Sequence, residues 1–146
     1  MLEKTNLLGA VVALLLYISA IAVFLFRLAG KPQYGHWIGY AEFLLGIPLL
    51  YLIWQAPQLQ RPILYYIQIG CMLAWLVLEA VLDYVLKIDF RQTRWIVIGY
   101  VMLFFAGTGG MLGVASNAGR TWGIVAVLLF LVMTVLSFVQ RLITGQ

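Results

Sequence analysis

The fold is decided by an uncharged apolar run near the start of the chain, LLGAVVALLLYISAIAVFLF (residues 7–26). About 20 consecutive apolar residues are what an α-helix needs to cross the hydrocarbon core of a bilayer. The small residues Ala20 and Ala22 resemble a signal-peptide cleavage site, but no polar region precedes them and the apolar run continues through Phe26. We therefore expect this segment to be a membrane-spanning helix rather than a cleaved leader.

The composition extends this expectation to the whole chain. Of its 146 residues, 64% are hydrophobic and only 10% are charged, and the mean hydropathy is +1.03. A soluble domain usually carries about a quarter charged residues. So few charges cannot cover a water-exposed surface, and most of the surface must therefore face lipid. The length allows one domain, and we treat residues 1–146 as a single transmembrane domain.

Five segments have the length and apolarity of a span, and they are residues 7–26, 37–54, 62–86, 95–116 and 121–140. The stretches between them are short and polar. Tryptophans mark four span ends, where an indole prefers the headgroup region. The second span contains Pro48, which predicts a kink. The expected fold is all-α, an integral membrane bundle of five transmembrane helices.

Basic residues predict the orientation of this bundle. One side of the membrane would hold Lys4, Arg61 and Arg120, and the other Arg27, Lys31, Lys87, Arg91, Arg94 and Arg141. Cytoplasmic loops carry the excess of Lys and Arg, so we expect the N-terminus outside and the C-terminus in the cytoplasm. We expect the membrane to be a prokaryotic cytoplasmic (plasma) membrane. The scatter of the basic residues over helix ends also argues against nucleic acid as a partner.

Three acidic residues fall within the predicted spans at one depth. Glu42 follows the start of the second span by five residues, and Glu79 and Asp83 precede the end of the third. At a rise of 1.5 Å per residue, all three lie roughly 5–10 Å inside the cytoplasmic edge. A charged side chain at a helix centre costs about 2.5–3.5 kcal/mol on the insertion scale, and such residues usually mark a functional site. We predict that they bind a small lipophilic or cationic ligand.

Other residues are expected to surround these acids. Trp75 and Gln68 share a helix face with Glu79, and Tyr100 lies at a similar depth on the fourth span. Arg27 and Arg141, at the ends of the first and fifth spans, are candidate counter-charges, and the sequence does not choose between them. A structural alternative is an ion-pair network at the cytoplasmic rim.

The fourth span is rich in small residues, among them Gly99, Ala106, Gly109, Gly110 and Gly113. Small residues at helical spacing predict close helix packing, either within the chain or across a dimer. The alternative is a helix broken at the glycines, whose freed amides bind a ligand.

Motifs for other chemistry are absent from the sequence. It contains no HExxH, no CxxC and a single cysteine, Cys71, so we expect no metal, no cofactor and no catalytic residue. The leading hypothesis is a multi-pass membrane protein that binds a small molecule or cation at its acidic cluster, and transport of that ligand across the bilayer is an optional extension of it. Two alternatives stay open. In the first, the chain is an accessory or assembly subunit of a membrane complex, its acids are structural, and a partner subunit or second copy docks on its glycines. In the second, it is an intramembrane enzyme acting on a lipophilic substrate.

Overall fold

The computed structural model describes residues 2–85 and 93–144, without the side chains of Asp83 and Thr144. All of the regular secondary structure in the described part is helical, and this part contains no strand. Its elements are α1 (Leu2–Leu28), α2 (Pro32–Leu44), α3 (Gly46–Gln55), α4 (Ile63–Glu79), the π-helical turn η1 (Ala80–Val85), α5 (Arg94–Ser116) and α6 (Arg120–Thr144).

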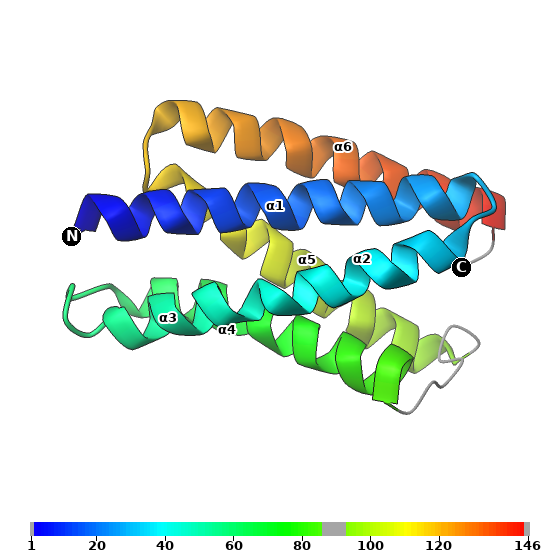
Figure 1. Ribbon diagram of the computed structural model, residues 1–146, viewed down its shortest axis with the longest axis horizontal. Coiled ribbons are helices and arrows are strands. Elements are labelled where there is room, and N and C mark those ends of the chain that lie inside the picture. Colours follow the sequence, from blue (N-terminus) through cyan, green and yellow to red (C-terminus); the bar gives the residue numbers. More distant parts are fainter. Residues whose placement is uncertain (1, 86–92, 145–146) are drawn as a thin grey trace.

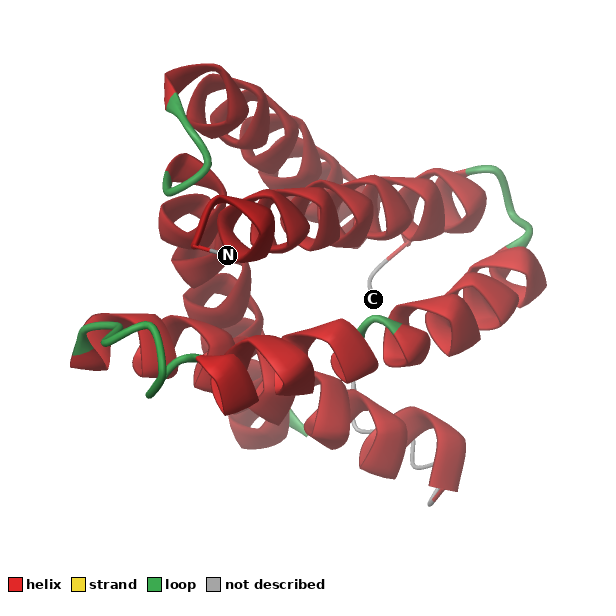
Figure 2. Cartoon of the chain, turned by 60° about the vertical axis from the view of Figure 1, so that its left-hand side comes forward, coloured by secondary structure: helices red, strands yellow, loops and turns green. Residues whose placement is uncertain are grey.

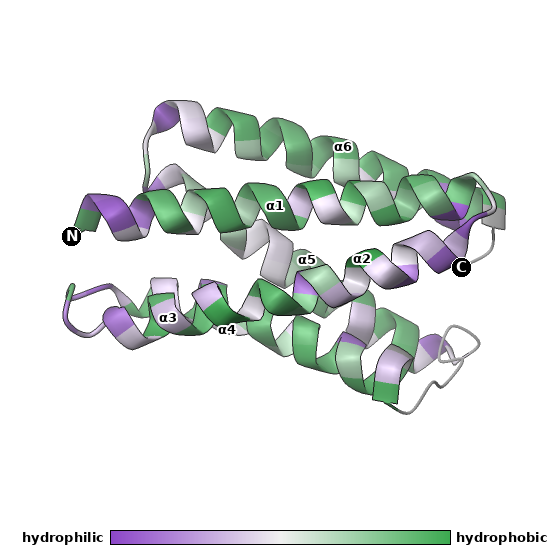
Figure 3. Ribbon diagram, in the orientation of Figure 1, coloured by the Kyte–Doolittle hydropathy of each residue, from purple (hydrophilic) through white to green (hydrophobic). Residues whose placement is uncertain are grey.

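Five helical segments are long and apolar enough to cross a membrane, as the sequence predicts, and they are Leu2–Leu28, Pro32–Gln55, Ile63–Leu82, Arg94–Ser116 and Arg120–Ile143. Most extend past the predicted limits, because helices continue into polar residues that an apolar run does not include. The helices lie along the long axis of the molecule, with the start of α1 and the end of α6 at opposite ends of the bundle (Figure 1). Hydrophobic residues cover the middle of the helices, and hydrophilic ones gather toward their ends (Figure 3). This distribution suits a protein embedded in lipid.

The second span is interrupted at Leu45, where α2 ends and α3 begins. The Leu45 amide donates to the Glu42 carbonyl, 3.0 Å away, in a tight turn. Pro48 has no amide hydrogen with which to continue the helical ladder back to Leu44. The second span is therefore interrupted three residues after Glu42, and Figure 2 shows the interruption as a short green turn between two helical segments.

A second irregularity follows Glu79, where α4 gives way to η1. A π-helical turn accommodates an extra residue per turn and rotates the side chains that follow it. Such turns occur often at functional sites. Both buried acids thus lie beside a place where the regular helix is interrupted.

The helix α1 is central to the bundle and packs against α2, α5 and α6. Its core face includes small residues such as the fully buried Ala10 and Ala13, which let the neighbouring helices approach closely. Further along this helix, the hydroxyl of Tyr17 donates to the Thr108 carbonyl of α5. These contacts make the middle of the bundle closely packed.

The glycine-rich part of α5 packs against α4 along one face. A Cβ atom added at Gly107 would lie 2.9 Å from the Met72 Cα atom, and one added at Gly110 would lie 3.0 Å from the Gln68 Cα atom. Gly113 contacts the side chain of Gln68. Because residues three apart share a helix face, Gly107, Gly110 and Gly113 form one packing surface within the chain, which we call the glycine seam.

This surface differs in part from the predicted one. An added Cβ at Gly99 or Gly109 would meet no described atom within 4 Å, and Ala106 is exposed. Gly107, which the prediction omits, instead makes the closest approach to the α4 backbone. The helix is also unbroken from Arg94 to Ser116, so the described chain does not contain the alternative of a helix broken at the glycines.

At the bundle end that holds the N-terminus, Arg61 joins α1 to α4. Its guanidinium donates to the side-chain oxygens of Thr5 and Asn6 and lies 4.5 Å from the centroid of the Tyr65 ring. The buried Nε atom of Arg61 has no hydrogen-bond partner among the described residues, so these contacts satisfy the guanidinium only in part. Within the described residues, the contacts of Arg61 at this end of the bundle are thus to uncharged groups.

The glycine seam predicts a difference between two matched substitutions in α5. Gly107→Ala should lower stability by about 1–3 kcal/mol, because the new methyl group meets the α4 backbone and the two helices must separate. Gly109→Ala adds the same methyl group in open space and should change stability by less than about 0.5 kcal/mol. Thermal unfolding of the purified variants in detergent measures both. Equal effects of the two substitutions would contradict the seam.

Candidate functional site

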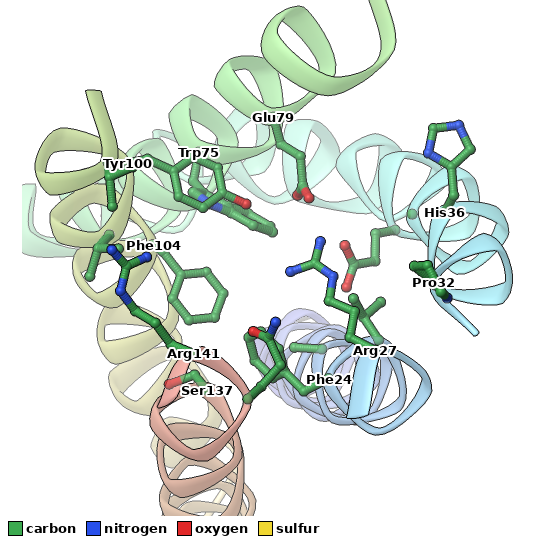
Figure 4. A pocket seen from close by; sticks show the side chains of 18 of the residues that line it. Phe24, Arg27, Pro32, His36, Trp75, Glu79, Tyr100, Phe104, Ser137 and Arg141 are labelled. Carbon is green, nitrogen blue, oxygen red and sulfur yellow. The ribbon is translucent and has the colours of Figure 1, made fainter. Parts of the chain in front are cut away.

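A cavity of about 290 Å³ lies inside the bundle, at the end that holds the α1–α2 turn and the last turns of α6. Side chains from α1, α2, α4, η1, α5 and α6 line it. Figure 4 shows side chains from helices on several sides converging on this central space. Close-packed protein interiors leave few spaces larger than a water molecule, so a cavity of this size is a candidate ligand site.

Glu42 and Glu79 line this cavity from α2 and α4. Their side chains are only 3% and 8% exposed, and the two carboxyl groups are close enough to interact electrostatically. The Glu79 carboxylate points into the cavity (Figure 4). The structure thus brings together two acids that are far apart in the sequence, at one level of the bundle.

Arg27, in the last turn of α1, accompanies the two acids. Its half-buried side chain lines the cavity and interacts electrostatically with Glu42. Figure 4 shows its guanidinium directed into the space below Glu79. Arg141 also lines the cavity, but it is exposed and lies on the side formed by α5 and α6 (Figure 4). Of the two candidate counter-charges, Arg27 is the one placed among the acids.

Aromatic rings form the wall beside the acids. Trp75 of α4 packs edge-on against Phe104 of α5, with 5.1 Å between ring centroids, and lies 6.1 Å from the Tyr100 ring. Phe24 of α1 meets Phe104 from the other side, at 6.2 Å. All four residues line the cavity. Aromatic faces attract cations, so this wall and the acids favour the same kind of guest.

The indole N–H of Trp75 is a buried donor in this wall. The side chain is 4% exposed, and within the described residues its nitrogen has no hydrogen-bond partner. A buried donor without an acceptor costs about 1–3 kcal/mol. An acceptor brought by a ligand would satisfy it.

Tyr84 of η1 lines the cavity and links the end of α4 to α2. Its hydroxyl donates to the His36 carbonyl at 2.6 Å, and its ring stacks on the His36 ring with 4.2 Å between centroids. Gly39 allows this contact, because a Cβ at that position would overlap the Tyr84 hydroxyl. The link fixes α2 next to the end of α4 and so sets the position of Glu42 relative to Glu79.

The remaining predicted site residues are placed differently. Trp75 and Tyr100 line the cavity, but Gln68 does not, because it packs against Gly110 and Gly113 about three turns away. Asp83 belongs to η1, and its side chain lies outside the described part of the chain.

The structure also adds residues that the sequence did not single out. Phe24 and Phe104 line the cavity, as does Gln140 of α6, which is only 2% exposed. Gln140 could have been found from the sequence, because this polar residue lies next to Arg141 and one helical turn after Ser137. The phenylalanines carry no such signal, since most aromatic residues in spans pack or face lipid. Within the described chain, no three His, Cys, Asp or Glu side chains are arranged to hold a metal ion.

Comparison with protein-family models, with curated proteins and with solved structures finds no match to this chain.

The link between Tyr84 and α2 predicts a rescue experiment. Gly39→Ala should destabilise the protein, because the added methyl group collides with the Tyr84 hydroxyl. In the Gly39→Ala, Tyr84→Phe double variant the colliding oxygen is gone, so the second substitution should cost less than it does alone. Thermal unfolding of the four proteins gives the coupling, expected at about 0.5–3 kcal/mol for residues in contact. Strictly additive effects would contradict the contact.

Proposed function

We propose that this chain is an integral membrane protein that binds a small organic cation with an apolar body in the cavity. The observation that carries the proposal is the meeting of Glu42 and Glu79, both buried, on the wall of one cavity. Ionisable groups inside a membrane bundle are costly and are usually functional.

The charges and surfaces of the cavity support a cationic guest. Two carboxylates and the Arg27 guanidinium meet inside it, while the other lining guanidinium, that of Arg141, is exposed. Among the described lining residues, the interior wall therefore holds two acidic side chains and one basic side chain that is not exposed. The rings of Trp75 and Phe104 would contact the apolar body of the guest and attract its charge.

The inner end of the cavity supports binding rather than an open channel. Toward the middle of the bundle, Tyr17, Met72, Thr108 and Met111 are all at most 2% exposed, and the Tyr17 hydroxyl bonds to α5. The predicted orientation would place the cavity on the cytoplasmic side of a plasma membrane. Transport across the bilayer would require this closely packed layer to open.

The two other hypotheses have less support. An accessory subunit would use its glycines to dock a partner helix, but Gly107, Gly110 and Gly113 already pack on α4 within the chain. An intramembrane enzyme would use one of the carboxylates as a general acid or base. It would bind its substrate in the same cavity, so the test of binding comes first.

The proposal predicts that both carboxylates contribute to binding. The probe is radiolabelled phenethylammonium, with the protein reconstituted in phosphatidylcholine nanodiscs. The wild-type protein should bind it saturably and should bind phenethyl alcohol, a neutral molecule of the same shape, more weakly. Glu42→Gln and Glu79→Gln should each weaken binding of the cation by at least about tenfold, a loss of about 1.4 kcal/mol.

A matched control is Glu3→Gln, which removes an exposed carboxylate in the first turn of α1, outside the cavity. It should leave the affinity unchanged. The proposal fails if the probe shows no saturable binding. It also fails if the cavity variants bind the probe as well as the Glu3 variant does.

A further inference from the structure

Arg27 places a positive charge of the protein where the proposed ligand would bind. Its guanidinium is directed into the cavity (Figure 4), and it interacts electrostatically with Glu42. A guanidinium is planar and carries five N–H donors, which match carboxylate oxygens. Arg27 thus offers the acids the same kind of interaction that a ligand cation would offer.

The backbone around Arg27 allows this side chain to leave. The residue lies in the last turn of α1, and its carbonyl accepts a hydrogen bond from the Gly30 amide in the turn that follows, where Gly30 has a φ of 75°. The turn is therefore held by the backbone and does not need the side chain. A long arginine stem at a span end can extend to the headgroup region, where phosphates and water solvate the charge.

We propose that Arg27 is a displaceable counter-ion that determines the specificity of the cavity, and that the ligand's cationic group takes its place against Glu42 and Glu79. This inference rests on the proposed function and adds the chemical class of the ligand. Buried carboxylates need hydrogen-bond donors as well as charge. The cationic group is therefore one that carries N–H donors, a protonated primary amine or a guanidine, rather than a quaternary ammonium.

Displacement has a measurable consequence for affinity. When a competing group occupies the site in most molecules, the apparent affinity equals the intrinsic affinity multiplied by the fraction of molecules whose site is free. Removing the competitor restores that fraction. A residue that instead held an anionic part of the ligand would have the opposite effect, because its removal would weaken binding.

The test measures binding of phenethylammonium and of its trimethylated analogue to protein in nanodiscs. Arg27→Gln should bind phenethylammonium about tenfold more tightly than the wild type, which corresponds to about 1.4 kcal/mol. Arg27→Lys keeps a competing cation and should remain close to the wild type. The control Arg120→Gln removes an exposed arginine at the start of α6, outside the cavity, and should have no effect. The trimethylated analogue should bind more weakly than the primary amine to every variant.

A second measurement uses the wild-type protein, in case Arg27→Gln does not fold. Phenylglyoxal modification, followed by mass spectrometry, reports the accessibility of each arginine. Saturation with phenethylammonium should speed modification of Arg27 and leave that of Arg120 unchanged. Slower or unchanged modification of Arg27 would overturn the inference, as would an Arg27→Gln variant that binds the probe no better than the wild type.

These failures are distinct from failure of the proposed function. If Glu79→Gln abolishes binding while Arg27→Gln leaves it unchanged, the cavity binds cations and only the exchange with Arg27 is wrong. If the trimethylated analogue binds as tightly as the primary amine, the requirement for N–H donors is wrong.

Discussion

The burial of two acidic side chains, Glu42 and Glu79, is the constraint on which the cavity end of the molecule depends. They lie inside a bundle whose outer surface is apolar and faces lipid. Neither Glu42 nor Glu79 is more than 8% exposed. Charge in such a place is tolerated only where other charges, polar groups or a polar cavity surround it. Arg27, the cavity itself and the aromatic wall of Trp75 and Phe104 supply that surrounding. The cavity therefore gives the two acidic side chains a polar space inside the bundle.

The two ends of the bundle differ in how they are built. Around the acids the helices are interrupted, at Leu45 in the second span and in η1 of the third, and Tyr84 joins the two interrupted segments. In the other half, glycines of α5 let its backbone approach α4, and Arg61 donates to the uncharged side chains of Thr5 and Asn6. Regular packing in one half supports irregular backbone in the other, as expected for a protein whose site lies at one end.

Hydropathy and helix geometry predicted much of this arrangement. The five spans follow from the length of the apolar runs, and the interruption of the second follows from Pro48. The common depth of Glu42 and Glu79 follows from the rise per residue. Contacts between helices were harder to predict. A projection of α5 shows which residues share a face but not which face meets α4, so Gly107 was missed and Gln68 was assigned to the site instead of to the glycine seam. The choice between Arg27 and Arg141 likewise depends on how α1 and α6 pack.

Side chains of α2 and α4 meet in one cavity, and cross-linking measures this proximity most directly. Glu42→Cys and Glu79→Cys would be combined in a Cys71→Ala background and treated in membranes with dibromobimane, which fluoresces strongly once it bridges two thiols. We predict a fluorescent bridge for this pair, and none for Glu42→Cys combined with Gln68→Cys, which lies in the glycine seam. Absence of a bridge between positions 42 and 79, whether or not each single cysteine reacts, would contradict the shared cavity.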